Sequence, residues 1–154
     1  MTLGIGDAVP AVTLLDADSA AIDLKALKGA PLVIYFYPKA DTPGCTVEAQ
    51  DFTRLALEFA KLNAQVLAVS RDAPAKLCKF RDKYGLTVRL ASDEDGAVCA
   101  AFGTWVEKQN YGRTYMGIER STFLFGADGK LAQIWRKVRV KGHAEAVLEA
   151  AKAL

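Results

Sequence analysis

Three cysteines, Cys45, Cys78 and Cys99, are the side chains of this 154-residue chain that most readily support chemistry. No two of them are spaced C-x-x-C, and their odd number argues against a secreted disulfide framework. His143 is the only histidine, so the spacings offer no tetrahedral zinc cluster, and we expect no metal site. The cysteines are therefore either small apolar core residues or redox-active thiols.

Cys45 stands at the start of a predicted helix, for which Thr42 is a plausible N-cap and Pro43 a suitable first residue. A helix N-terminus favours an anion, so a thiolate there is a candidate nucleophile. Because Cys45 precedes Phe52 by seven residues, it should point toward the core, and Gly44 lets a small ligand approach the backbone. Position alone is equally compatible with a packing or capping cysteine.

The elements that must position Cys45 form a strand–helix–strand unit. Apolar runs at 32–37 and 65–70 predict buried strands, and the spacing of apolar residues between them predicts one helix from 43 to 62. Such a crossover makes the two strands parallel. The loop before Cys45 then lies at the carboxyl end of a strand, where ligand sites of open α/β sheets form.

The rest of the chain completes an α/β pattern. We expect a central mixed β-sheet with helices on both faces and an N-terminal β-hairpin, in one domain spanning 1–154. In chain order, the remaining elements are a hairpin within 12–24, a helix over 74–84, a short strand at 88–90, a short helix over 97–102, a loop over 103–117, antiparallel strands at 121–125 and 130–135, and a helix over 143–153.

Charge and hydropathy exclude several classes of partner. The formal net charge is +2, from 20 basic and 18 acidic residues, so we expect neither a nucleic-acid nor a membrane partner. On a strand, Lys137, Arg139 and Lys141 would share one solvated face or blunt a sheet edge. The longest clearly apolar run, 32–37, is too short to span a bilayer, and no targeting segment is visible. We therefore expect a cytoplasmic protein.

The segment 35–49 reads YFYPKADTPGCTVEA, in which Pro38, Thr42 and Cys45 fit the pattern P-x-x-x-[TS]-x-x-C. It resembles the active-site segment of peroxiredoxins, particularly the peroxiredoxin Q or bacterioferritin comigratory protein subfamily. Blocks at 90–93, 115–123 and 140–143 extend the resemblance over essentially the whole chain.

This resemblance implies a thioredoxin-like fold and the reduction of hydrogen peroxide and organic hydroperoxides without a cofactor. It makes Cys45 the peroxidatic cysteine, which becomes a sulfenic acid. Thr42 and Gly44 would help to bind the peroxide, Arg120 would stabilise the thiolate and the polarised peroxide, and Pro38 would shield the pocket from water.

Glu48 lies one turn after Cys45. We expect it either to orient an arginine or to be an acid favoured by the helix dipole. His143 is expected to cap or pack rather than to catalyse.

The chain departs from the subfamily pattern at the resolving cysteine. Many members carry it five residues after the peroxidatic cysteine, where this chain has Gln50. Others place it on the helix after the next strand, where Cys78 lies, so Cys78 is the first choice. Cys99 reads as a core residue, and an external thiol stays an alternative. The Cα atoms of a disulfide lie about 4.4–6.8 Å apart, and Cys45 and Cys78 are expected on separate helices that are farther apart than this. We therefore expect the first turn of the Cys45 helix, and part of the Cys78 helix, to unwind when the bond forms.

The same resemblance implies thioredoxin or a similar dithiol as reductant, a role in antioxidant defence, and a monomer or weak homodimer. Two other functions stay open at this point. A thiol–disulfide oxidoreductase is disfavoured by the missing C-x-x-C motif. A redox sensor or holdase would oxidise Cys45 without turnover.

Overall fold

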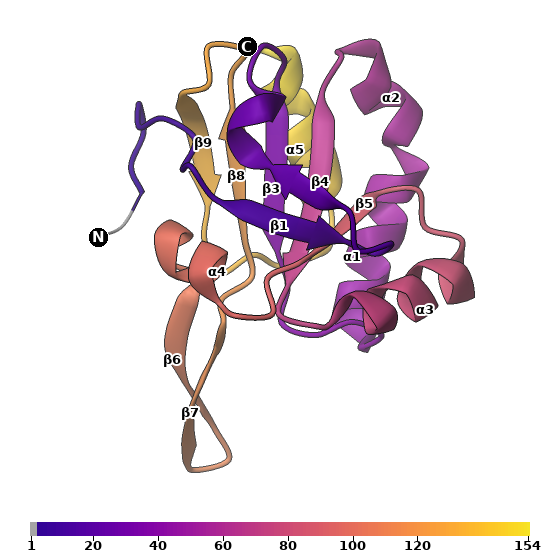
Figure 1. Cartoon of the computed structure of the whole chain (residues 1–154), viewed down its shortest axis with the longest axis vertical. Helices are drawn as coiled ribbons and strands as arrows, with labels where there is room; N and C mark the ends of the chain where they lie inside the picture. Colours follow the sequence, from indigo (N-terminus) through magenta and orange to yellow (C-terminus); the bar gives the residue numbers. More distant parts are fainter. Residues whose placement is uncertain (1–2) are drawn as a thin grey trace.

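The computed structural model describes residues 3–154, which form a mixed sheet of seven strands and a separate hairpin (Figure 1). The strand order in the sheet is β2-β1-β5-β4-β3-β8-β9. The strands are β1 (Thr13–Asp16), β2 (Ala21–Asp23), β3 (Leu32–Phe36), β4 (Gln65–Ser70), β5 (Arg89–Ser92), β6 (Trp105–Asn110), β7 (Arg113–Ile118), β8 (Ser121–Phe125) and β9 (Leu131–Trp135). The helices are η1 (Leu24–Leu27), α1 (Pro43–Arg54), α2 (Ala56–Lys61), α3 (Pro74–Tyr84), α4 (Ala97–Phe102) and α5 (His143–Lys152).

The strand–helix–strand unit that carries Cys45 is confirmed, because β3 pairs with β4 in parallel. On its other side, β3 pairs antiparallel with β8. The single helix expected over 43–62 is wrong: Leu55, with φ −94° and ψ 7°, separates α1 from α2. The apolar spacing continues across Leu55 into α2, so periodicity does not reveal this break.

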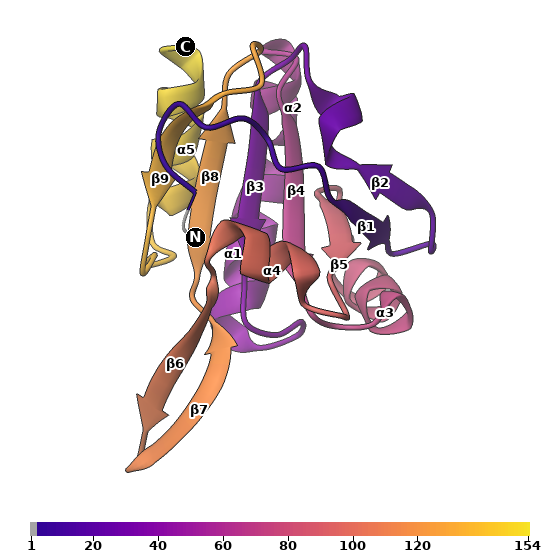
Figure 2. The ribbon, with the colours of Figure 1, turned by 60° about the vertical axis from the view of Figure 1, so that its left-hand side comes forward.

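The sheet separates two apolar cores, and β3 contributes alternate residues to each. Val33 and Tyr35 face the core covered by α1, α2, α3 and α5, whereas Ile34 and Phe36 face the core beneath α4 and η1. Figure 2 shows α4 on one side of the sheet and α1 and α5 on the other. Helices on both faces, as expected, therefore bury β3 completely.

The loop expected over 103–117 is wrong, because β6 and β7 pair there as an antiparallel hairpin that extends away from the sheet (Figure 2). Most side chains of this hairpin are exposed, so no alternation of apolar and polar residues marks the strands. Its two-residue turn places Tyr111 and Gly112 at φ 52° and 75°, which are the left-handed values of a tight hairpin turn.

Most of the remaining predictions are confirmed: the β1–β2 and β8–β9 hairpins, α3, α4 and α5 all form. The short strand is observed slightly later, as β5. The basic residues Lys137, Arg139 and Lys141 lie on no strand, and Lys137 has φ 49°, so the expected shared face is wrong. Among residues 3–154, no helix is both long and apolar enough to cross a bilayer.

Candidate active site at the start of α1

Cys45 is the third residue of α1 and is 2% exposed in the core on the α1 side of the sheet. The first intrahelical hydrogen bond runs from the Thr46 N–H to the Thr42 carbonyl at 2.9 Å. The N–H groups of Gly44 and Cys45 therefore belong to the helix start, where backbone donors face outward along the axis. Sulfur and donors share one end of the helix, as its sequence predicts.

Arg120 joins this helix end from the segment between β7 and β8. Its Nη2 donates to Cys45 Sγ at 3.3 Å, and its Nη1 donates to Glu48 Oε1 at 2.6 Å. A Cβ atom on Gly44 would lie 3.3 Å from the same Nη2, so the glycine leaves room for the guanidinium. The structure thus brings together Gly44, Cys45, Glu48 and Arg120, all of which the sequence singles out.

Glu48 and Arg120 are buried with the sulfur. The side chain of Glu48 is 1% exposed and that of Arg120 is 17% exposed. Burial raises the pKa of Glu48 to about 7, although Arg120 acts in the opposite direction. Burial lowers the pKa of Arg120, but the contacts of the guanidinium with Glu48 and Cys45 outweigh burial, so the pKa of Arg120 is raised. The guanidinium therefore stays charged beside the sulfur.

Three further polar atoms lie buried in this region. Within the described residues, the hydroxyls of Tyr35 and Tyr37 and the Oε2 atom of Glu48 have no protein hydrogen-bond partner. The Tyr35 ring stacks on Phe52 of α1 at a centroid distance of 4.6 Å. Aromatic packing thus fills the core beside α1, two turns after Cys45.

Thr42 occupies the N-cap position of α1, but its hydroxyl does not cap the helix. It donates instead to the Lys39 carbonyl at 2.8 Å. The side-chain cap suggested by the sequence is therefore wrong, because the preceding loop turns a carbonyl toward the hydroxyl. Pro38 is exposed at the start of this loop.

The loop before α1 is fixed by contacts that sequence analysis misses. Asp72 Oδ2 accepts the Ala40 N–H at 2.8 Å. The Asp41 carboxylate accepts from the Tyr84 hydroxyl at 2.6 Å and from Lys83 at 2.9 Å. Asp41 has φ 60°, a left-handed value that aspartate tolerates better than most residues. These partners are 32 to 43 residues away, so no local pattern could reveal them.

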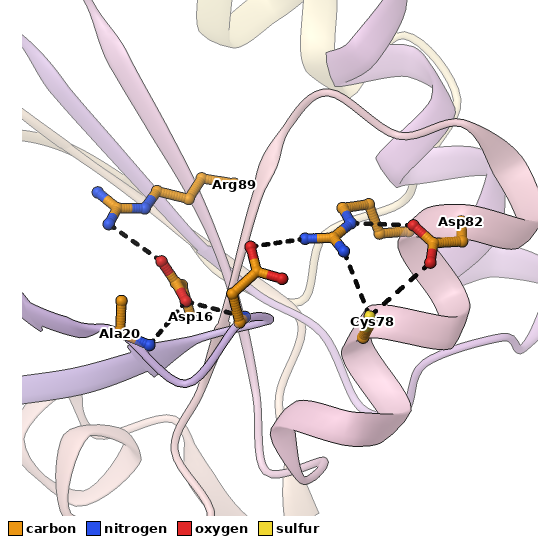
Figure 3. Close-up of polar contacts among 7 residues, drawn as sticks. Asp16, Ala20, Cys78, Asp82 and Arg89 are labelled. Atoms are coloured by element: carbon orange, nitrogen blue, oxygen red, sulfur yellow. Dashed lines mark hydrogen bonds and ion pairs between the residues drawn. The ribbon is translucent and has the colours of Figure 1, made fainter.

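Cys78 lies apart from this cluster, on α3, and is half-buried. Its sulfur contacts Arg81 Nη2 at 3.2 Å and Asp82 Oδ2 at 3.8 Å (Figure 3). Cys45, Cys78 and Cys99 are all free thiols in this structure.

Cys99 lies on α4 and is fully buried in the core on the opposite side of the sheet from Cys45. Burial, and then the carboxylate of Asp93, raises the pKa of its thiol. Asp93 Oδ2 also accepts the Cys99 N–H at 2.7 Å. This environment favours the neutral thiol of a core residue.

Two other ionisable groups lie near Arg120. His143 Nε2 is 2.7 Å from the Thr122 hydroxyl, and burial followed by the charge of Arg120 lowers the pKa of His143 to about 4. This buried position matches the expected packing role. Lys108 of β6 was missed: burial and then Arg120 lower its pKa, and Cys45 opposes them. Lys108 lies in the segment 103–117, which was predicted to be a loop, so the sequence did not indicate that it faces the site.

Comparison with known proteins identifies the family and agrees with this fold. The model of the AhpC/TSA family matches residues 5–134. Peroxiredoxin Bcp of Xanthomonas campestris is 52% identical over 130 residues, covering 84% of this chain and 81% of that protein. Peroxiredoxin Bcp of Bacillus subtilis is 43% identical over 152 residues, covering 99% and 97%.

Solved structures give the same result. A cysteine-to-serine mutant of PrxQ from Xylella fastidiosa has a TM-score of 0.94 at 40% identity, covering 99% of this chain and 98% of that one. A structure of the bacterioferritin comigratory protein of Xanthomonas campestris, from work on its alkyl peroxide reduction activity, has a TM-score of 0.89 at 47% identity, covering 96% and 98%.

The chain therefore belongs to the AhpC/TSA family and is a peroxiredoxin of the Q, or bacterioferritin comigratory protein, type. Its fold is thioredoxin-like, and its class of activity is thiol-dependent peroxidase, which uses a hydroperoxide and a thiol reductant.

Proposed function

We propose that Cys45 is the peroxidatic cysteine of this peroxidase. The observation that carries the proposal is the 3.3 Å contact between Arg120 Nη2 and Cys45 Sγ at a helix N-terminus. A buried cation and the helix dipole both favour the thiolate, which is the attacking form of cysteine. Glu48 would act through Arg120, because its carboxylate fixes the other edge of the guanidinium.

In the proposed reaction, the Cys45 thiolate attacks one oxygen of the hydroperoxide. A sulfur–oxygen bond forms and the O–O bond breaks. The attacked oxygen keeps its hydrogen in the sulfenic acid, and the leaving oxygen takes from solvent a proton equivalent to the one that the Cys45 thiol released, so that it becomes water or an alcohol. Arg120 and the N–H groups of Gly44 and Cys45 would meet the charge that develops on the oxygens. Because the Thr42 hydroxyl donates to Lys39, its oxygen can accept the O–H of the peroxide. Pro38 would limit access of water to the sulfur.

We further propose that Cys78 resolves the sulfenic acid as an intramolecular disulfide, which thioredoxin or a similar dithiol then reduces. Cys45 and Cys78 lie on different helices, so the first turn of α1 must unwind, and part of α3 with it. Opening there would break the contacts of Asp41 with Lys83 and Tyr84. Local opening of this kind is typical of functional segments.

Hydrogen peroxide and organic hydroperoxides are the proposed substrates. Alkyl peroxide reduction by the Xanthomonas campestris protein supports the organic class. We propose that residues 1–154 act as one domain, as a monomer or weak homodimer, in antioxidant defence in the cytoplasm, without a cofactor, nucleic acid or membrane. The near-neutral net charge and the unpaired thiols support this setting.

Peroxide consumption by four proteins tests these roles, with a thioredoxin system as reductant. We expect Cys45→Ser to fall to the rate without enzyme, because within residues 3–154 only the Cys45 sulfur contacts a largely buried arginine. Cys78→Ser should lose thioredoxin-dependent turnover but keep one round of peroxide reduction. Cys99→Ser, the matched control, should turn over like the wild type. Full activity of Cys45→Ser would refute the proposal, and unchanged turnover of Cys78→Ser would refute its resolving role.

A further inference from the structure

We propose that Arg81 is a positioning residue that keeps the Cys78 thiol ready to attack the sulfenic acid of Cys45. This inference rests on the proposed resolving role of Cys78. It adds a residue of α3 that no motif around Cys45 includes.

Arg81 contacts three groups at once. Its Nη2 lies 3.2 Å from Cys78 Sγ, its Nε donates to Asp82 Oδ1 at 3.1 Å, and its Nη1 donates to Asp18 Oδ2 at 3.0 Å. Cys78 and Arg81 are three residues apart, so they face each other whenever that turn of α3 is helical. Asp18 belongs to the turn between β1 and β2, so the guanidinium is held from outside its own helix as well.

The turn that holds Arg81 is itself well fixed. Asp16 Oδ1 accepts the N–H groups of Asp18 and Ala20, both at 2.9 Å. Arg89 of β5 pairs with the other carboxylate oxygen of Asp16 at 3.3 Å (Figure 3). The charged groups that contact the Cys78 sulfur are therefore Arg81 and Asp82 on α3. Asp18 on the hairpin pairs with Arg81, and the Asp16–Arg89 pair lies behind it.

Arg81 and Asp82 act on the sulfur in opposite directions. Asp82 Oδ2 lies 3.8 Å from Cys78 Sγ and can accept its S–H, which favours the neutral thiol. Arg81 is closer, favours the thiolate, and also pairs with the other oxygen of Asp82. Loss of Arg81 would therefore remove a cation and leave an unpaired carboxylate beside the sulfur.

The thiolate matters because it is the form that attacks. In the resolving step, a bond forms between the sulfurs of Cys78 and Cys45, and the S–O bond of the sulfenic acid breaks. The oxygen leaves with its own hydrogen and the proton released by Cys78, as one water molecule. Each sulfur ends at the disulfide level, Cys78 oxidised and Cys45 reduced by one electron equivalent. A higher thiolate fraction at Cys78 speeds this step.

Alkylation of Cys78 by iodoacetamide tests the effect on the thiol itself. In Cys45→Ser/Cys99→Ser protein, Cys78 is the only thiol, and we compare Arg81→Gln, Asp82→Asn and Lys79→Gln. At pH 7, Arg81→Gln should react more slowly, because less of Cys78 is then thiolate. The change should be only about threefold, because the site is half-exposed and a more basic thiolate is intrinsically more nucleophilic. Asp82→Asn should react faster. Lys79→Gln removes an exposed charge from the same helix and should not change the rate.

The pH dependence separates ionisation from a merely structural role. At about pH 10, where thiols are largely ionised, the deficit of Arg81→Gln should disappear, and Arg81→Lys should recover most of the rate at pH 7. A deficit of equal size at both pH values, or a rate at pH 7 equal to that of Lys79→Gln, would overturn the inference.

The lifetime of the Cys45 sulfenic acid distinguishes this inference from the function on which it rests. In Cys99→Ser protein, Arg81→Gln should lengthen that lifetime about threefold, in line with its slower alkylation. If Cys78→Ser leaves the lifetime unchanged, the resolving role and the inference both fail. If Cys78→Ser lengthens it but Arg81→Gln does not, only the inference fails.

Discussion

The guanidinium of Arg120 lies 3.3 Å from the Cys45 sulfur, and that of Arg81 lies 3.2 Å from the Cys78 sulfur. Each arginine is also bound by carboxylates, Glu48 at the first sulfur and Asp82 with Asp18 at the second. The two contacts are thus alike in chemistry and distance. Their surroundings differ, because Arg120 and its carboxylate partner are largely buried in the core, whereas Arg81 and its partners lie at the protein surface.

Burial is what separates the two regions. Glu48 is 1% exposed and Arg120 17%, whereas Arg81 is 30% exposed and Asp82 68%. Charges in a core interact strongly, because little water screens them, whereas surface pairs are weakened by solvent and salt. We therefore expect the same geometry to have a large effect on Cys45 and a modest one on Cys78. That order fits the proposed roles, in which Cys45 reacts with a free peroxide and Cys78 reacts with a sulfenic acid on the same chain.

The larger of two further predictions concerns His143, which lies in the buried region. Burial and Arg120 lower its pKa to about 4, from an ordinary value of 6.5. Stability due to the neutral ring is therefore present above pH 6.5 and is lost as the pH falls toward 4. In wild type this loss should reach at most about 3 kcal/mol, and His143→Gln should lack it.

Urea unfolding of both proteins at several pH values between 4 and 8 measures this difference. Only the difference between the two proteins is used, because Glu48 changes its protonation in the same interval. Parallel stability curves for wild type and His143→Gln would contradict the proposed burial of a neutral histidine beside Arg120.

The smaller prediction concerns the exposed region. Asp18→Asn removes the carboxylate in the β1–β2 turn that forms an ion pair with Arg81. Since both side chains reach solvent, the melting temperature should fall by no more than about 2 °C in dilute buffer, and the change should vanish in about 1 M salt. Thermal unfolding at the two salt concentrations checks this. A large loss that persists in high salt would place this ion pair among the strong contacts of the fold.

The sequence predicts the buried region better than the exposed one. Local patterns place Cys45 near the start of α1 and Glu48 one turn after it, and the resemblance to peroxiredoxins singles out Arg120. No local pattern joins Asp41 to Tyr84 or Arg81 to Asp18, because those pairs are 43 and 63 residues apart and depend on how the elements pack. Local sequence also did not predict the partner of the Thr42 hydroxyl, which donates to the Lys39 carbonyl and does not cap α1.

The fold shows the same division. Buried strands such as β3 carry a clear apolar signal, and they were predicted. The β6–β7 hairpin was missed because its strands are mostly exposed, although Asn110, Tyr111 and Gly112 form a turn that could have marked it. The break at Leu55 was missed because apolar residues keep their spacing across it.

The most direct test is the rate at which hydrogen peroxide oxidises Cys45 in a single turnover, in Cys78→Ser/Cys99→Ser protein. The same substitution is made at both arginines, Arg120→Gln and Arg81→Gln. Loss of a buried donor to the reacting atoms should slow Arg120→Gln about 100-fold or more. Arg81→Gln should stay within about twofold of its parent, because its contact is at the other cysteine. Equal rates for the two variants would contradict the central claim that buried Arg120 makes Cys45 the reactive thiol.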